Sequence, residues 1–374
     1  MGTDDPERRA LELFLGGDVM TGRGVDQILP YPSAPRIYED YLRDARDYVA
    51  LAEGKSGPIA RPVGFDAIWG DALVELRRAT VRVVNLETSV TESEVPWPGK
   101  GISYRMSPRN VGTLTAAGLD VCVLANNHVL DWERAGLVET LETIRAAGMQ
   151  TAGAGRDAIE AEAPAIVELP GGRRLLVVAV AEPMSGVPLA WAARPDVPGV
   201  ALVRRLDDEE ADAIAARLER VRRRGDVAVV SIHWGSNWGY EVDEAHVRFA
   251  HALVDRAIDV VFGHSSHHPR PIELYEGKPI FYGCGDLIND YEGIRGYEAF
   301  RNDLVLTYSV RFAGGAVALR MTPFQLRQMR LERASLPDAR WLAASIAEGS
   351  RRYGTAIVLG EDGALRATAA GASS

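Results

Sequence analysis

Short apolar runs alternate with amphipathic segments along most of this chain. The amphipathic segments have helical spacing and predict helices over 34–52, 66–78, 108–117, 133–147, 206–224 and 242–256. The apolar runs predict buried strands, five of which lie at 13–18, 81–87, 121–128, 227–233 and 260–267. Strands that alternate with helices are typical of a layered α/β domain.

The pattern changes after residue 270. Short segments there read as antiparallel strands joined by glycine-rich turns, at 271–275, 279–282, 304–312 and 316–321. We expect these strands to form the second sheet of a sandwich, followed by a helix near 336–350. The domain boundaries that follow are a tail at 1–10, one domain at 11–325, a helical extension at 326–365 and a disordered tail at 366–374.

Each of the five apolar runs ends in residues that can bind a metal. These residues are Asp18, Glu87, Asn127 with His128, His233, and His264 with His267. Ligands of open α/β sheets sit beyond the carboxyl ends of the strands, so we expect these side chains to converge. Carboxylate, amide and imidazole groups together favour a divalent metal over a structural thiolate-bound zinc. The pattern therefore predicts a metalloenzyme.

Composition narrows the class of protein. The chain has 374 residues, a net charge of −10 and 47% hydrophobic residues, so it can bury a large core and is not expected to bind nucleic acid. Two cysteines exclude a disulfide framework and favour a cytoplasmic protein. No secretory signal or membrane-spanning run is present in the sequence, so we expect no membrane partner.

Several short motifs, in this order, resemble the bacterial CapA family of poly-γ-glutamate and capsule synthesis proteins. They are Gly17 to Arg23, Asn85 to Thr88, Ala125 to His128, His233 to Gly235, and the stretch from Gly263 to Asp290. The resemblance extends from residue 11 to about 325. It implies a four-layer α/β/β/α sandwich of the calcineurin-like metallophosphoesterase fold, with one or two divalent metal ions at the strand ends.

The resemblance also implies roles for single residues. The implied metal ligands are Asp18, Glu87, Asn127, His233 and His267. His128 would be the catalytic imidazole, His264 a ligand or a direct neighbour of the ligands, and Arg23 would face an anionic group of the substrate. In an epimerase, His264 or an acidic neighbour would be the second base beside His128. Imidazole suits proton transfer because its ordinary pKa lies near neutrality.

Two departures from the phosphoesterase pattern weaken the case for phosphoester hydrolysis. The family of that fold begins with Asp-x-His, and Met20 stands at the third position here. The late Gly-His-x-His motif is also altered, because His264 and His267 are separated by two serines. We expect Asp286 or Asp290 to orient a ligand imidazole.

Each candidate also has a structural alternative. Asp18 can be a helix cap and Asn127 a turn former. Trp97, Trp234 and Trp238 are candidates for substrate binding, although rigid aromatic side chains can equally serve only to pack.

Three functions remain open at this stage. The preferred hypothesis is a metal-dependent epimerase that inverts Cα centres of a peptide, because anchorless relatives of the family include an epimerase of lasso-peptide biosynthesis. The alternatives are a metallophosphoesterase and an accessory protein of poly-γ-glutamate or capsule synthesis. The ligand types do not select among Mn, Zn, Fe, Mg and Ca, and the oligomeric state is open.

Overall fold

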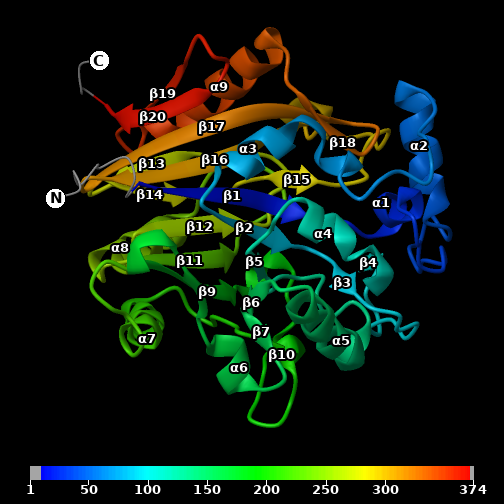
Figure 1. Ribbon diagram of the computed structural model, residues 1–374, viewed down its shortest axis with the longest axis horizontal. Coiled ribbons are helices and arrows are strands. Elements are labelled where there is room, and N and C mark those ends of the chain that lie inside the picture. The colour runs from blue at the N-terminus through cyan, green and yellow to red at the C-terminus, as the bar shows by residue number, and fades with distance from the viewer. Residues whose placement is uncertain (1–9, 371–374) are drawn as a thin grey trace.

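Two β-sheets lie face to face with helices outside them, as Figure 1 shows for the computed structural model. The structure describes residues 10–370. The first sheet has ten strands: β1 (Leu11–Val19), β2 (Val81–Leu86), β5 (Val121–Val123), β6 (Gln150–Ala152), β15 (Asp286–Ile288), β16 (Leu304–Ala313), β17 (Ala316–Arg327), β18 (Arg330–Arg333), β19 (Thr355–Leu359) and β20 (Leu365–Ala369). Its order is β19–β20–β17–β16–β1–β2–β5–β6, with β15 paired to β1 and β18 to β17.

The second sheet has six strands in the order β13–β14–β12–β11–β9–β8. They are β8 (Ala165–Glu168), β9 (Arg174–Ala181), β11 (Val227–His233), β12 (Val260–His264), β13 (Ile272–Tyr275) and β14 (Lys278–Phe281). Two short pairs stand apart: β3 (Ser89–Val90) with β4 (Arg105–Met106), and β7 (Ala154–Gly155) with β10 (Gly199–Val200).

The helices are α1 (Arg23–Ile28), α2 (Arg46–Ser56), α3 (Leu73–Arg78), α4 (Gly112–Ala116), α5 (Glu133–Ala146), α6 (Ala158–Glu162), α7 (Asp208–Glu219), α8 (Glu244–Asp255) and α9 (Leu336–Arg351). Helices α7 and α8 pack on β9 and β12 of the second sheet, whereas α3 contacts β1 and α5 contacts β6 of the first sheet (Figure 1). None of the helices in residues 10–370 is long and apolar enough to cross a membrane.

Strand β9 shows why the sheets are buried on both faces. Its side chains alternate between two apolar clusters, with Leu175, Val177 and Ala179 facing the first sheet, and Leu176, Val178 and Val180 facing α7 and α8. A strand that is covered on both sides needs a continuous apolar sequence. The expected four-layer α/β/β/α sandwich is therefore confirmed.

The sequence prediction assigned strands to sheets incorrectly. The five site-bearing strands do not share one central sheet, because β1, β2 and β5 belong to the first and β11 and β12 to the second. Nor do the strands after residue 270 form a sheet of their own. Strands β13 and β14 join β12, whereas β16 and β17 continue the first sheet beyond β1.

Some expected element boundaries also differ. The helix expected at 34–52 begins only at Arg46, and the helix expected at 206–224 ends at Glu219. The expected helical extension at 326–365 contains α9 but also β18 and β19, which pair within the first sheet. Residues 366–369 lie in β20 rather than in a disordered tail, and residues 1–9 and 371–374 lie outside the described part.

Candidate metal centre and cavity

The carboxyl ends of strands from both sheets meet at one edge of the sandwich. Asp18 lies near the end of β1, Glu87 directly follows β2, and Asn127 follows β5 in the first sheet. His233 and His264 are the last residues of β11 and β12 in the second sheet. Residues that are distant along the chain therefore become neighbours.

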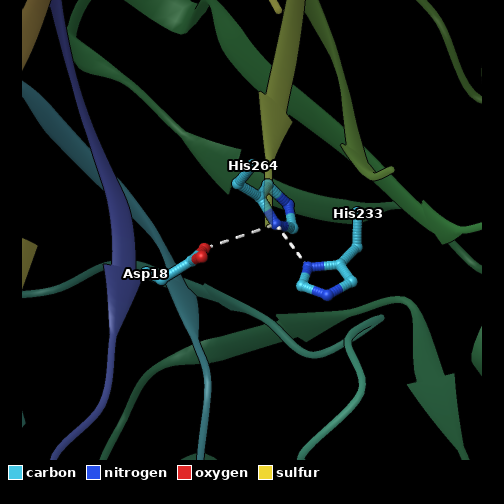
Figure 2. Close-up of side chains that lie close together, drawn as sticks. All are labelled: Asp18, His233 and His264. Atoms are coloured by element: carbon cyan, nitrogen blue, oxygen red, sulfur yellow. Dashed lines mark hydrogen bonds and ion pairs between the residues drawn. The ribbon is translucent and has the colours of Figure 1, made fainter. Parts of the chain in front are cut away.

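Asp18, His233 and His264 form the closest group of metal-binding side chains. One ligand atom from each lies within 4.8 Å of the others, and all three residues are buried. Figure 2 shows the three side chains pointing toward one another from β1, β11 and β12. His264 Nδ1 lies 3.0 Å from His233 Nδ1 and 3.6 Å from a carboxylate oxygen of Asp18. This spacing suits a single cation held by all three.

Two buried polar atoms beside this group have no partner among residues 10–370. They are His233 Nε2 and Asn127 Oδ1; His233 Nε2 lies across the ring from the Nδ1 that faces His264, so His233 would bind an ion through only one of the two nitrogens at a time. A buried polar atom without a hydrogen bond is costly, so a native structure normally explains it by a bound group. An imidazole nitrogen and an amide oxygen are both ligands of divalent metals. The residues present therefore fit the metal that the resemblance implies.

Negative charge is concentrated at the same place. Asn85 donates one amide hydrogen to Asp18 at 2.7 Å and the other to Glu87 at 3.1 Å, which holds the two carboxyl groups together. Burial, and then the charge of Asp286, raises the pKa of Asp18 to about 7. Burial, and then Asp18, raises the pKa of Glu87 well above its ordinary value. A divalent cation would relieve this repulsion.

A cavity of about 440 Å³ opens beside these residues. Its polar lining comprises Arg23, Glu87, Lys100, Asn127, His128, Asn237, Ser265, His267 and Asn302. Its apolar and aromatic lining comprises Tyr41, Ile102, Tyr104, Trp238, Tyr291, Ile294 and Tyr297. Cavities of this size hold small organic ligands, and a few convergent polar groups within aromatic walls fix their orientation.

His128 is held from three sides. Its Nδ1 lies 2.7 Å from Asp131 Oδ2, its ring stacks on Tyr104 at 3.7 Å, and Lys100 Nζ approaches Nδ1 at 3.0 Å. Burial, and then the Lys100 charge, lowers the pKa of His128 to about 4. Its Nε2 lies 3.9 Å from Glu87. The low pKa keeps the imidazole of His128 neutral, and its Nε2 faces Glu87, one of the candidate metal ligands.

His267 has a different environment although it lines the same cavity. Its Nδ1 lies 3.0 Å from Asp286 Oδ1, and Asn289 donates to the other oxygen of Asp286 at 2.8 Å. Burial is the largest influence and lowers the pKa of His267, but Asp286 and Asp18 together raise the pKa above its ordinary value. Asp286 therefore orients the imidazole of His267, a predicted metal ligand that lies outside the group of Asp18, His233 and His264.

Arg23 is not arranged as expected for a residue that binds a substrate anion. It donates from Nε and Nη2 to Asp290 at 3.2 and 2.5 Å, and from Nη1 to Glu39 and Tyr48 at 2.8 Å each. Four of the five guanidinium N–H groups are therefore used inside the protein. His264 also differs from a general base, since it is 1% exposed and does not line the cavity.

The structure separates the three candidate tryptophans. Trp238 lines the cavity and stacks face to face on Tyr297 at 4.0 Å. Trp234 is buried among apolar residues on the outer side of the second sheet and donates its indole N–H to Tyr282. Trp97 packs edge-on against Trp191 and does not line the cavity. The structure does not bring Trp97 or Trp234 into contact with the cavity.

Sequence reasoning missed Lys100, Asp131 and Tyr104. Lys100 Nζ lies 2.5 Å from Asp131 Oδ1, and the other oxygen of Asp131 accepts from the backbone N–H of Tyr104 at 2.7 Å. Lys100 and Tyr104 lie in the long loop after β3 and Asp131 three residues beyond His128, where no periodic pattern marks them. The one available signal is the glycine pair that flanks Lys100, which is typical of a functional loop.

The chain is similar in sequence to known bacterial proteins. The model of the family described as bacterial capsule synthesis protein PGA_cap matches residues 12–291. A relative in Mycobacterium tuberculosis, named a probable polyglutamine synthesis accessory protein, is 48% identical over 359 residues and covers 94% of each chain. The PGA biosynthesis protein CapA of Bacillus subtilis is 23% identical over 314 residues, which are 83% of this chain and 70% of that protein.

A solved structure, TT1561 of Thermus thermophilus, aligns with 80% of this chain and 93% of its own at 11% identity, with a TM-score of 0.37. A likeness of this degree carries no inference about activity. The names of the relatives do not confirm the lasso-peptide epimerase hypothesis. The family model matches three quarters of the sequence, and the mycobacterial relative is similar over nearly its whole length. The chain therefore belongs to the bacterial capsule synthesis protein PGA_cap family.

Proposed function

We propose that this protein is an accessory protein in the synthesis of a glutamate polymer or capsule, and that it acts there as a metal-dependent acid/base enzyme on an amide-linked chain. The names of its relatives support the accessory role. One observation supports the chemistry: two buried polar atoms have no partner among residues 10–370, namely Asn127 Oδ1 on the lining of the cavity and His233 Nε2 in the buried group with Asp18.

The residues that would hold the cation are Asp18, Glu87, Asn127, His233 and His264. A divalent ion in such a site supplies Lewis-acid polarisation of a carbonyl oxygen. The side chains of the protein do the remaining work. Their tasks are to admit and orient the chain and to move protons at its reacting atoms.

Two imidazoles line the cavity from different sheets. His128 follows β5 and is held at Nδ1 by Asp131, whereas His267 follows β12 and is held at Nδ1 by Asp286. In each ring a carboxylate binds one nitrogen, so the other nitrogen is the one available for proton exchange. This arrangement provides a general acid and a general base for one substrate.

The walls of the cavity fit a chain better than a compact anion. Ile102 and Ile294 offer aliphatic surface, Trp238 offers a flat aromatic face, and the amides of Asn237 and Asn302 can pair with backbone amides. Because Arg23 is largely occupied, recognition of the chain depends on these groups rather than on free cationic side chains.

The second candidate is inversion of a Cα centre in such a chain. The observation that favours it is again that His128 and His267 come from different sheets, since inversion needs a base and an acid on opposite sides of one carbon. Phosphoester hydrolysis is favoured less, because Met20 occupies the position of a phosphoesterase ligand and is itself buried.

One experiment separates these activities. The Mn²⁺-loaded protein is incubated with polyglutamate chains in D₂O, and chain length and deuterium at Cα are measured, with an aryl phosphate assayed in parallel. Shortened chains indicate hydrolysis, and deuterium without shortening indicates epimerisation. Both signals should disappear in His128→Ala and persist in His251→Gln, whose histidine pairs with Glu273 outside the cavity.

The accessory role is tested separately in the source organism. Deletion of the gene should lower the amount of cell-associated glutamate polymer or capsule, and the wild-type gene should restore it. Restoration by the His128→Ala gene would show that the role needs no catalysis at this site. Unchanged polymer after deletion would refute the accessory role.

A further inference from the structure

Arg23 occupies an unusual position in the fold. It is the first residue of α1, it is 3% exposed, and its backbone has a φ of +43°, a value that residues other than glycine seldom adopt. Strained backbone of this kind persists where the surroundings determine it strongly, and it is concentrated at functional sites. Here the hydrogen bonds from the Arg23 guanidinium to Asp290, Glu39 and Tyr48 hold the residue in this conformation.

On one side, the guanidinium contacts the aromatic support of His128. The Arg23 guanidinium carbon lies 4.7 Å from the centre of the Tyr104 ring. The same Tyr104 ring stacks on His128 at 3.7 Å with an angle of 22° between the planes. A displacement of the Arg23 side chain therefore removes a contact that sets the plane of the His128 imidazole.

On the other side, Arg23 holds the segment that supports His267. Asp290, which receives two hydrogen bonds from the guanidinium, also accepts from the backbone N–H of Gly24 at 2.9 Å. The next residue, Tyr291, packs edge-on against His267 at 5.3 Å. The same segment carries Asp286, which binds His267 Nδ1.

The two sides are also joined directly. The hydroxyl groups of Tyr104 and Tyr291 lie 2.6 Å apart, and the guanidinium carbon of Arg23 lies 5.6 Å from the Tyr291 ring centre. Arg23 thus contacts both of the tyrosines that bridge the two imidazoles.

We infer that Arg23 is a positioning residue that fixes the imidazoles of His128 and His267 relative to each other, through Tyr104 on one side and residues 286–291 on the other. It acts through these neighbours and does not bind the substrate. The importance of this positioning for catalysis rests on the proposed function. The positioning of the two imidazoles by Arg23 does not depend on that function.

The test uses metal-free protein labelled with ¹⁵N-histidine and no substrate. In Arg23→Lys, which keeps the charge but loses the planar fork, the ring-nitrogen resonances of both His128 and His267 should shift, while that of His251 stays in place. Resonances are assigned by single His→Gln variants.

The chain offers a matched control in Arg174. It is 4% exposed and binds Asp226 with Nε at 3.2 Å and Nη2 at 2.5 Å, the same two distances that join Arg23 to Asp290. It begins β9, at the end of the second sheet opposite to His233. Arg174→Lys should lower stability without moving the resonances of His128 or His267.

Unchanged resonances of His128 and His267 in folded Arg23→Lys would overturn the inference, and so would equal shifts in Arg174→Lys. If Arg23→Lys does not fold, Glu39→Gln decides, because it removes only the charge of one guanidinium partner. Shifts confined to the two imidazoles then support the inference, and their absence overturns it. Failure of the wild-type protein to bind Mn²⁺ would refute the proposed function and leave this result unaffected.

Discussion

Replacing Asp18 by asparagine should make the metal-free protein more stable at pH 8 while removing its response to metal. In the folded protein burial, and then Asp286, raises the pKa of Asp18 from an ordinary 3.8 to about 7. Between these values the folded state binds a proton that the unfolded state has released, so stability falls as pH rises through this window. At pH 8 the full cost of the buried charge is present.

The size of the effect follows from the same residues. A rise in pKa from 3.8 to about 7 corresponds to about 4 kcal/mol, at about 1.4 kcal/mol for each pH unit. Asparagine carries no charge, and its oxygen still accepts from Asn85. The hydrogen bond from the Ser265 backbone N–H, at 3.3 Å, would be lost at a cost of about 1 kcal/mol. We therefore expect a net gain of about 3 kcal/mol at pH 8, which shrinks to below about 1 kcal/mol at pH 5.

Urea unfolding in the presence of a chelator measures this difference. Asp226→Asn is the matched control: burial raises the pKa of Asp226, but the hydrogen bonds and charges of Arg174 and Arg223 together lower it below its ordinary value, so neutralisation should reduce stability. Addition of Mn²⁺ should stabilise the wild-type protein and leave Asp18→Asn nearly unchanged. A loss of stability at pH 8 in Asp18→Asn, or a gain that is equal at pH 5 and pH 8, would refute the reasoning.

Four further outcomes are expected. A divalent metal at 100 times its dissociation constant should raise the free energy of unfolding of the wild-type protein by about 2.7 kcal/mol, as measured by urea titration. The same metal should have almost no effect on His233→Gln but its full effect on His251→Gln, and equal responses would contradict the proposed ligand set. Gly17→Ala should cost at least about 2 kcal/mol, because a Cβ there would lie 1.8 Å from the carbonyl oxygen of Gly285. Gly54→Ala, where an added Cβ would meet no atom outside its own stretch of helix within 4 Å, should gain about 0.5–1 kcal/mol by calorimetry, and a loss of stability would contradict this expectation.

The sequence was sufficient to predict which strand ends carry carboxyl and imidazole side chains that converge. Asp18, His233 and His264 end apolar runs whose composition requires burial on both faces, and that burial is a local property of the sequence. The division of these strands between two sheets could not be predicted in the same way. A strand followed by a helix has the same local pattern whichever sheet receives it, since pairing depends on residues far away in the chain.

The surroundings of the imidazoles were beyond prediction for a related reason. Lys100 and Tyr104 reach His128 from a loop without periodicity, and their burial results from tertiary packing alone. The partners of Arg23 could not be predicted because a sequence shows the charge of an arginine but not the acids that surround it. Glu39 and Asp290 lie 16 and 267 residues away.

The division of the ligands between the two sheets has a mechanical consequence. Asp18, Glu87 and Asn127 belong to one sheet and His233 and His264 to the other, so an ion held by all of them would cross-link the two halves of the sandwich at a single rim. Between the sheets the two halves are joined by apolar packing, to which Leu175, Val177 and Ala179 of β9 contribute. Uptake of the ion would therefore fix the two sheets relative to each other at this rim. Protection of backbone amides from hydrogen exchange should then rise at the strand ends of both sheets together.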